Sequence, residues 1–306
     1  MKAKKSTMTI SPVFIHQPKR HRWIPKQSPI AHYSNIAACR PIMARLAIVM
    51  FAAVAYHGQQ HAQGGDAGAL RLRSKTMFDE MSPWSGAIYQ SASGVEMIRH
   101  GAFSPDNGRT WKPTPVSPDF DSGLPYGYRR SPHTPWRDPV NGNILVLLNC
   151  MDTPDKDPRA HEPRWQWYWY YLRYRVSTDG GRTWQFDEPI IQKGERFSAA
   201  HPIDGVHIGK NCYFLGDAGC RPIRTREGTV LVPVQMPPLD PSGEGFHNPG
   251  GGWYWLDSRV LIGRWTDDNH ITWDVSQPIE GNGDRTARGL YEPTLAEMPD
   301  GKILCV

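Results

Sequence analysis

The sequence has no apolar segment long enough to cross a membrane. Its clearest apolar run, Leu46–Ala55, has about ten residues, whereas a transmembrane helix needs about 20. It also has no Cys-x-x-Cys pair of the kind that binds zinc. We therefore expect no stable membrane span, no metal and no other cofactor.

Acidic residues are absent from the first 42 positions, which carry eight Lys or Arg. Because the formal net charge of the whole chain is +5, the rest of the chain has a charge near −3 (+5 − 8). Nucleic-acid binding leaves a basic stripe or patch on a domain, and no such stripe remains after position 42. We therefore expect no nucleic-acid partner.

The apolar run lies in a segment that is typical of secretion signals. Met43-Ala-Arg45 precedes the run, and Ala53-Val-Ala55 offers a small-residue cleavage site. We expect an exported (periplasmic or extracellular) protein with a signal-like segment at 43–62 and translation starting at Met43. A disordered basic arm ahead of a buried strand is the alternative. The domain boundaries follow: an extension at 1–63 and a folded domain at 64–306.

Only five cysteines are present, and one of them, Cys39, lies in the basic extension. In an exported chain the other four could pair in three ways. Cys212 and Cys220 are close enough to close a hairpin. Unpaired buried thiols are the alternative.

Glycine (29), proline (28) and aromatic residues (12 Trp, 12 Tyr, 9 Phe) are plentiful, as in proteins with many short strands joined by turns. A short motif recurs among them, as SPDNGRTW at 104–111, STDGGRTW at 177–184 and TDDNHITW at 266–273. The Ser or Thr hydroxyl and the Asp carboxylate can accept hydrogen bonds from backbone N–H groups of the same turn, and the Trp can anchor the turn in the core. We interpret the motif aspartates as structural rather than catalytic: Asp106, Asp179 and Asp268.

A second motif, a proline followed by a turn glycine and a β-rich run, keeps step with the first. It starts at Pro135, Pro222 and Pro293. The aspartate of the first motif follows Pro135 by 44 residues and Pro222 by 46. Each unit predicts strand, turn, strand, long connection, strand, hairpin and strand, which is a four-stranded β-propeller blade. The fold class is therefore all-β.

The two motifs together resemble the sialidase (neuraminidase) superfamily of Asp-box, or BNR-repeat, proteins over about residues 85–306. The segment LYEPTLAEMPDGKIL at 290–304 is similar to the sialidase segment in which a Glu polarises a nucleophilic tyrosine. The resemblance implies a six-bladed propeller, of which about three blades fit here. It also implies a glycan partner and an exo-glycoside hydrolase that uses tyrosine as nucleophile.

Site residues carry over from this resemblance one at a time. Glu292 matches the tyrosine-polarising Glu, and Asp152 or Asp155 would be the acid/base. The family's first carboxylate-binding arginine corresponds to His133 by spacing to Gly142, or to Arg130 if the alignment slips by three residues. Arg221, at the start of the next unit, is a second candidate for contact with an anionic sugar.

The resemblance places the second and third arginines and the nucleophilic tyrosine beyond Val306. We therefore expect an incomplete site that is inactive as a hydrolase. The alternatives are a non-catalytic Asp-box propeller that binds glycan or protein, and a decayed open reading frame. The aromatic run at 165–174, WQWYWYYLRY, is predicted to be a strand whose rings pack between sheets or stack on sugars.

Overall fold

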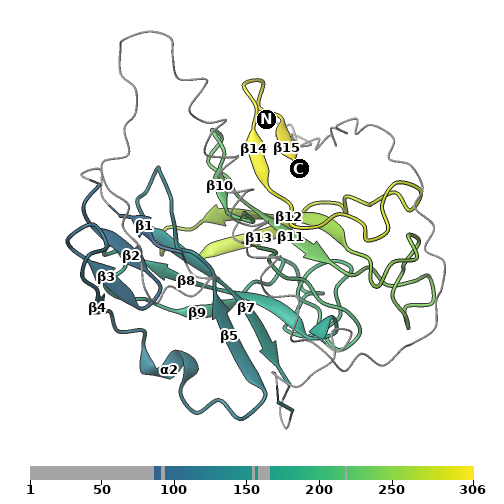
Figure 1. The fold of residues 1–306 in the computed structure, drawn as a ribbon, viewed down its shortest axis with the longest axis horizontal. Helices are drawn as coiled ribbons and strands as arrows, with labels where there is room; N and C mark the ends of the chain where they lie inside the picture. Colours follow the sequence, from purple (N-terminus) through teal and green to yellow (C-terminus); the bar gives the residue numbers. More distant parts are fainter. Residues whose placement is uncertain (1–85, 91–93, 154–155, 158–165, 218) are drawn as a thin grey trace, which may run out of the picture. The chain divides into compact units, whose positions relative to one another are not determined.

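The computed structural model describes residues 86–90, 94–153, 156–157, 166–217 and 219–306. The predicted extension, signal-like segment and Asp155 lie outside these residues. Within them, no helix has the length and apolar character needed to cross a membrane. The described part is mostly β (Figure 1), with one helix of four residues, α2 (Pro118–Asp121).

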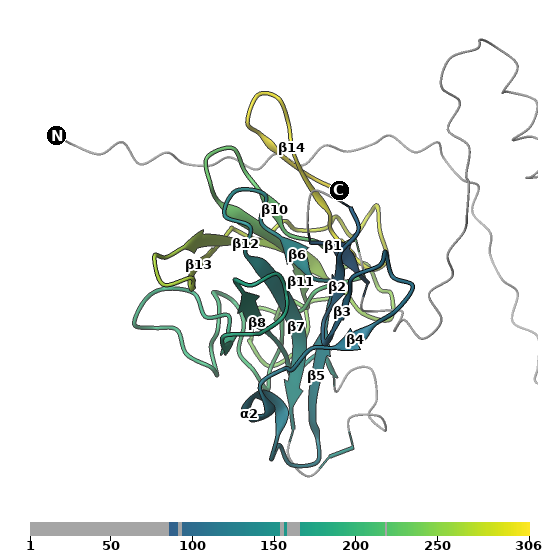
Figure 2. The same cartoon turned by 90° about the vertical axis from the view of Figure 1, so that its left-hand side faces the viewer.

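The strands form small antiparallel sheets that follow one another along the chain. Sheet 1 contains β1 (Ile88–Tyr89), β2 (Met97–Arg99), β3 (Ala102–Ser104) and β4 (Lys112–Pro113), paired in that order. Sheet 2 contains β5 (Tyr128–Pro132), β6 (Trp136–Arg137), β7 (Ile144–Asp152), β8 (Tyr170–Ser177) and β9 (Asp187–Pro189). In sheet 2 both β5 and β6 pair with β7 (Figure 2), and β8 and β9 follow.

Two further sheets complete the described part. Sheet 3 contains β10 (Ile223–Arg224), β11 (Val230–Met236), β12 (Asp257–Trp265) and β13 (Ile271–Val275), again paired in chain order. Sheet 4 is a pair, β14 (Leu295–Glu297) and β15 (Ile303–Cys305). The second sequence motif therefore forms the first hairpin of sheets 2, 3 and 4. Its turn glycines all adopt a left-handed backbone, with φ of 78°, 84° and 82° at Gly142, Gly228 and Gly301.

The aromatic run differs from its prediction. Strand β8 begins at Tyr170, and residues 166–169 form a turn in which Trp169 N donates to Gln166 O (3.0 Å). The strand therefore starts five residues later than the sequence suggested. The turn directs Trp167 toward the aromatic residues Phe214 and Tyr254.

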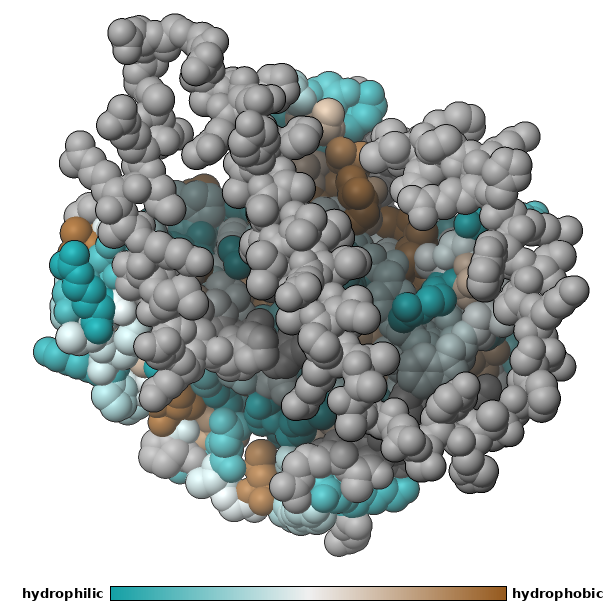
Figure 3. Space-filling view, viewed as in Figure 1, coloured by the Kyte–Doolittle hydropathy of each residue, from teal (hydrophilic) through white to brown (hydrophobic). Residues whose placement is uncertain are grey.

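The sheets pack face to face in chain order, because the middle sheets bury both faces. Along β7, Ile144, Val146 and Leu148 join a cluster with Ile98 of sheet 1, whereas Leu145 and Leu147 join one with sheet 3. This alternation is the two-residue period of a strand. On β11, Val230, Val232 and Val234 likewise face sheet 2, whereas Leu231 packs with Leu295 of sheet 4. Apolar surface remains visible near β14 and β15 (Figure 3).

The first two Asp-box turns have the predicted hydrogen bonds. Gly108 N donates to Ser104 Oγ (2.8 Å), and Thr110 donates to Asp106 through its backbone N (2.8 Å) and its hydroxyl (2.7 Å). In the second turn, Gly181 N donates to Ser177 Oγ (2.8 Å), and Thr183 donates to Asp179 twice, at 2.9 and 2.6 Å. Each box links the last two strands of its sheet.

The third Asp box is different because His270 stands where the other two have a glycine, Gly108 and Gly181. Asp268 accepts the Thr266 hydroxyl, while the Thr272 hydroxyl donates to Arg264 O (3.3 Å) instead. The His270 ring stacks on Phe186 (4.1 Å between centroids) and its Nδ1 lies 3.0 Å from Glu188. This hairpin therefore binds to sheet 2 through the His270 side chain.

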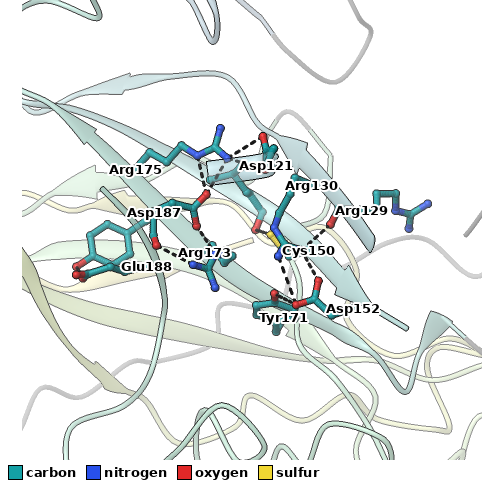
Figure 4. Close-up of polar contacts among 12 residues, drawn as sticks. Asp121, Arg129, Arg130, Cys150, Asp152, Tyr171, Arg173, Arg175, Asp187 and Glu188 are labelled. Atoms are coloured by element: carbon teal, nitrogen blue, oxygen red, sulfur yellow. Dashed lines mark hydrogen bonds and ion pairs between the residues drawn. The ribbon is translucent and has the colours of Figure 1, made fainter. Parts of the chain in front are cut away.

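Buried ionic contacts fasten neighbouring sheets to one another. The fully buried Arg175 of β8 donates to both oxygens of Asp121 in α2 (3.0 Å each) and to Asp187 of β9 (2.8 Å) (Figure 4), and its Nη1 lies 2.8 Å from Nε2 of His100 in the turn between β2 and β3 of sheet 1. Between sheets 2 and 3, the fully buried Asp138 accepts Arg224 Nη1 (2.8 Å) and Trp265 Nε1 (2.7 Å). These contacts fix the orientation of each sheet relative to the next.

The four described cysteines are unpaired. Cys150, Cys212 and Cys220 are buried and Cys305 is partly buried. The hairpin disulfide between Cys212 and Cys220 is therefore not formed, and these thiols pack as small apolar side chains.

Candidate functional site

A pocket of about 360 Å³ opens where the start of sheet 2 meets the segments that precede sheets 3 and 4. This volume is within the range of small-ligand pockets. Polar side chains from β5, β7 and β11 form part of the wall, and aromatic side chains form much of the remainder. Its lining residues are Arg129, Ser131, His133, Asn149, Gln166, Trp167, Tyr170, Phe214, Leu215, Gly216, Asp217, Gln235, Tyr291 and Glu292.

Arg129 supplies the positive charge of the pocket. Its guanidinium lies 5.1 Å from the Tyr170 ring centroid and donates to the Tyr170 hydroxyl. Burial lowers the pKa of Arg129 from its ordinary value. Among the described residues no carboxylate pairs with Arg129, and its Nε has no hydrogen-bond partner. A desolvated guanidinium without a counter-ion is suited to bind a carboxylate, because its planar fork can donate to both oxygens.

His133 is held neutral at the back of the pocket. The Asn149 amide is oriented by Leu215, since its Oδ1 accepts Leu215 N (2.9 Å) and its Nδ2 donates to Leu215 O (3.1 Å). The same Nδ2 lies 3.1 Å from His133 Nε2, which must therefore be the acceptor. Burial lowers the pKa of His133 from 6.5 to about 4. The imidazole consequently adds a hydrogen-bonding group to the pocket but no charge near neutral pH.

Two carboxyl groups, Asp217 and Glu292, lie together on the other side of the pocket. Desolvation, followed by the charge of Asp217, raises the pKa of Glu292 above its ordinary value. The Glu292 backbone has φ of 53°, and its N–H donates to Gln235 Oε1 (2.9 Å). Positive φ at a residue other than glycine is uncommon and costs about 1–3 kcal/mol. The contact with the buried Gln235 helps to hold Glu292 in this conformation.

Aromatic rings build the wall between these two charged sides. Trp167 packs against Phe214 and Tyr254, with 4.9 Å between ring centroids in both pairs. Tyr254 continues to Tyr291 (5.4 Å). Arg288 lies over the Tyr254 and Tyr291 rings at 4.6 and 4.5 Å. Such a wall provides flat apolar surface for the C–H face of a sugar ring, and its ring edges carry hydroxyl groups.

The structure brings together two of the residues that the sequence nominated for the site. Glu292 and His133 line the same pocket. Arg130 does not line it, because side chains alternate along β5 and Arg130 lies on the opposite face from Arg129. There Arg130 forms an ion pair with Asp152, which also accepts the Tyr171 hydroxyl, while Arg129 points away from them (Figure 4).

The other nominated residues lie elsewhere. Arg221 borders a separate cavity of about 10 Å³ that His133 also lines. Asp106, Asp179 and Asp268 sit on the Asp-box hairpins. Asp155 lies outside the described residues.

Several pocket residues were not anticipated from the sequence. Arg129 could have been found by the alternation rule, because positions 129, 131 and 133 share one strand face. Asn149 of β7 pairs with Ser131 of β5, and this pairing places it on the pocket side of the sheet. No sequence pattern around Asp217 predicts its place in the pocket, since Glu292, which lines the same pocket, is 75 residues away in the sequence.

Comparisons with known proteins give only remote similarity. No family model matches the sequence. No curated protein matches it. Among solved structures, the chain is similar to Hadza microbial sialidase Hz136, with 20% identity, a TM-score of 0.39, and coverage of 66% of this chain and 33% of that one.

A protein of unknown function from Dyadobacter fermentans has 18% identity and a TM-score of 0.40, over 69% of this chain and 50% of that one. The intramolecular trans-sialidase from Ruminococcus gnavus, in complex with oseltamivir carboxylate, has 15% identity and a TM-score of 0.28, over 68% of this chain and 34% of that one. This chain thus spans between a third and a half of their lengths. We therefore base the proposed function on the geometry of the pocket.

Proposed function

We propose that the pocket binds an acidic sugar of a glycan, with Arg129 holding the sugar carboxylate. The observation that carries this proposal is the state of Arg129, which is partly buried in the wall of the pocket and has no carboxylate partner among the described residues. Partial burial of an unpaired charge is unfavourable. An anionic ligand would offset that cost by providing the missing counter-ion.

The remaining walls favour a sugar over a simple anion. Trp167 and Tyr170 provide flat rings, and Ser131, His133 and Asn149 provide hydrogen-bonding groups in the same pocket. This mixture of aromatic faces and a few convergent polar groups is typical of small-ligand sites. A bare inorganic anion would use Arg129 and leave the rings unoccupied.

The wider proposal is a sialidase-type Asp-box β-propeller of an exported protein. Its supports are the chain-ordered antiparallel sheets, the Asp boxes at equivalent hairpins and the sequence resemblance. In that family the residue matching Glu292 assists a tyrosine nucleophile. A carboxyl group with a raised pKa beside an anion site also suits a hydrolase. The second candidate is a non-catalytic propeller that binds glycan, which requires only the pocket.

Binding to the full chain tests the proposal. Titration calorimetry would compare the α-methyl glycoside of N-acetylneuraminic acid with neutral methyl β-galactoside. We expect the acidic sugar to bind at least tenfold more tightly, and Arg129→Gln to remove that preference. Arg109→Gln, at an exposed position on the Asp-box hairpin of sheet 1, is the matched control. Equal affinity for both sugars in the unaltered protein would contradict the proposal.

Turnover separates the two candidates. Release of 4-methylumbelliferone from its α-sialoside, abolished by Glu292→Gln, would identify a hydrolase. Binding of the acidic sugar without turnover would identify a glycan-binding protein. Urea unfolding curves of Arg129→Gln and Glu292→Gln would show whether each variant retains the fold.

A further inference from the structure

Hydrogen bonds join three residues on one side of the pocket, Arg129, Tyr170 and Gln166. We propose that Tyr170 and Gln166 are positioning residues, which hold the Arg129 guanidinium in the orientation that receives a carboxylate. This inference rests on the proposed function for its ligand. The positioning itself can be measured without a ligand.

Strand pairing places Arg129 and Tyr170 in one row of sheet 2. Met151 of β7 is the partner both of Arg129 on β5 and of Tyr170 on β8. Residues directly opposite one another in antiparallel strands lie on the same face of the sheet. Because neighbouring strands are about 4.8 Å apart, the Cα atoms of Arg129 and Tyr170 are separated by about 10 Å. The Arg129 side chain therefore extends along the sheet, past the position of Met151, to reach the Tyr170 hydroxyl.

The chemistry of the three groups fixes the direction of each hydrogen bond. A guanidinium can only donate, so the Tyr170 oxygen accepts from Arg129 Nη2. The hydroxyl proton of Tyr170 is then free to be donated to Gln166 Oε1, which lies 3.0 Å away. An amide oxygen only accepts, so the Gln166 side chain must turn its oxygen toward Tyr170. Only one arrangement of protons satisfies both bonds, and it holds the guanidinium in one direction.

Neutral partners distinguish Arg129 from its neighbour Arg130. On the opposite face of the sheet, the Asp152 carboxylate pairs with Arg130 and also accepts the Tyr171 hydroxyl. The charge of Arg130 is therefore compensated within the protein. Arg129 is held instead by a phenol whose own acceptor is an amide. Such partners orient the guanidinium and leave its charge available to a ligand carboxylate.

The turn at 166–169 explains how Gln166 reaches Tyr170. In a continuous strand, residues four positions apart are separated by about 13 Å, which is too far for this hydrogen bond. The turn, closed by Trp169 N donating to Gln166 O (3.0 Å), brings the two side chains together. The late start of β8 thus gives part of the aromatic run a role in the pocket.

Binding of the α-methyl glycoside of N-acetylneuraminic acid to the full chain tests this role. Tyr170→Phe keeps the ring that packs against Phe214 (5.4 Å between centroids) and removes only the hydroxyl. We expect affinity to fall about tenfold, because the ligand must then order the Arg129 side chain itself. Gln166→Met, which removes the amide acceptor, should cause a smaller loss.

Two controls separate positioning from a general effect on the pocket. Tyr168→Phe, in the same turn but packed on Phe246, should leave affinity unchanged. In an Arg129→Gln background, Tyr170→Phe should cause no further loss, because the residue that it positions is gone. Unchanged affinity in Tyr170→Phe alone, or an equal loss with and without Arg129, would overturn the inference.

Nitrogen-15 NMR of the arginine side chains keeps the two proposals distinguishable. The Nε–H signal of Arg129 can be assigned by its loss in Arg129→Gln. We expect its order parameter to fall in Tyr170→Phe and to stay unchanged in Tyr168→Phe. An unchanged order parameter in Tyr170→Phe would refute the positioning role whether or not a sugar binds. A lowered order parameter in a protein that binds no acidic sugar would refute only the proposed function.

Discussion

Arg129 and Arg130 are adjacent in the sequence and lie on opposite faces of β5. Arg129 lines the pocket without a carboxylate partner among the described residues, whereas Arg130 forms an ion pair with Asp152 (Figure 4). The alternation of side chains along a strand causes this division. One arginine is therefore available to a ligand, and its neighbour stabilises the sheet.

Substituting each arginine with lysine should separate these two roles. Arg129→Lys keeps the charge but loses the planar fork, so we expect affinity for an acidic sugar to fall at least tenfold, about 1.4 kcal/mol. Arg130→Lys should leave affinity unchanged and lower the free energy of unfolding by about 1–2 kcal/mol, because its contact with Asp152 weakens. Calorimetric binding and urea unfolding measure the two effects. If Arg130→Lys lowered the affinity and Arg129→Lys did not, Arg130 would be the ligand-binding residue.

Removing the buried charge that joins sheets 2 and 3 should strongly destabilise the fold. Asp138→Asn leaves Arg224, whose side chain is only 13% exposed, without its carboxylate. Breaking one side of a buried pair costs about 3–5 kcal/mol, and we expect a loss of that order in urea unfolding. Asp300→Asn is the matched control, because the pair of Asp300 and Lys302 is exposed and should contribute little to stability. Similar losses in both variants would contradict the role of the Asp138–Arg224 pair in joining the two sheets.

Stability should decrease in mild acid because the buried His133 and the partly buried His100 are held in their neutral form. Burial lowers the pKa of both His100 and His133 to about 4, below the value of 6.5 in the unfolded chain. As pH falls from 6.5 to about 4 the unfolded chain binds protons that the folded chain resists, so the free energy of unfolding falls.

His100→Gln should make this dependence shallower, by on the order of 2 kcal/mol across the window. His247→Gln, at an exposed position, is the control. Urea unfolding at several pH values provides the measurement. An equally steep dependence in His100→Gln would show that His100 is not responsible.

The Asp boxes should contribute unequally to stability. Asp179 accepts hydrogen bonds from Ser177, Arg182 and both donors of Thr183, all between 2.6 and 3.0 Å. We expect Asp179→Ala to lower the free energy of unfolding by about 1–3 kcal/mol. Asp268→Ala should cost less, because Asp268 accepts a side-chain hydrogen bond from Thr266 alone among the described residues. An equal loss in the two variants would show that the third hairpin depends on its aspartate as the second does.

The amino-acid sequence by itself determined the local parts of this protein. The Asp boxes and the turn glycines depend on hydrogen bonds and backbone angles within a few residues, so spacing alone identifies them. The strand start at Tyr170 was missed because aromatic residues favour strands whether or not they occur in a turn.

Tertiary structure decided the site. A shift of one residue along a strand exchanges its faces, so only the pairing of β5 with β7 shows that Arg129, and not Arg130, lines the pocket. Likewise, Asp217 and Glu292 line the same pocket because Gly216 admits the backbone of a segment far along the chain. Such contacts depend on how sheets and connections pack, and no pattern of neighbouring residues encodes them.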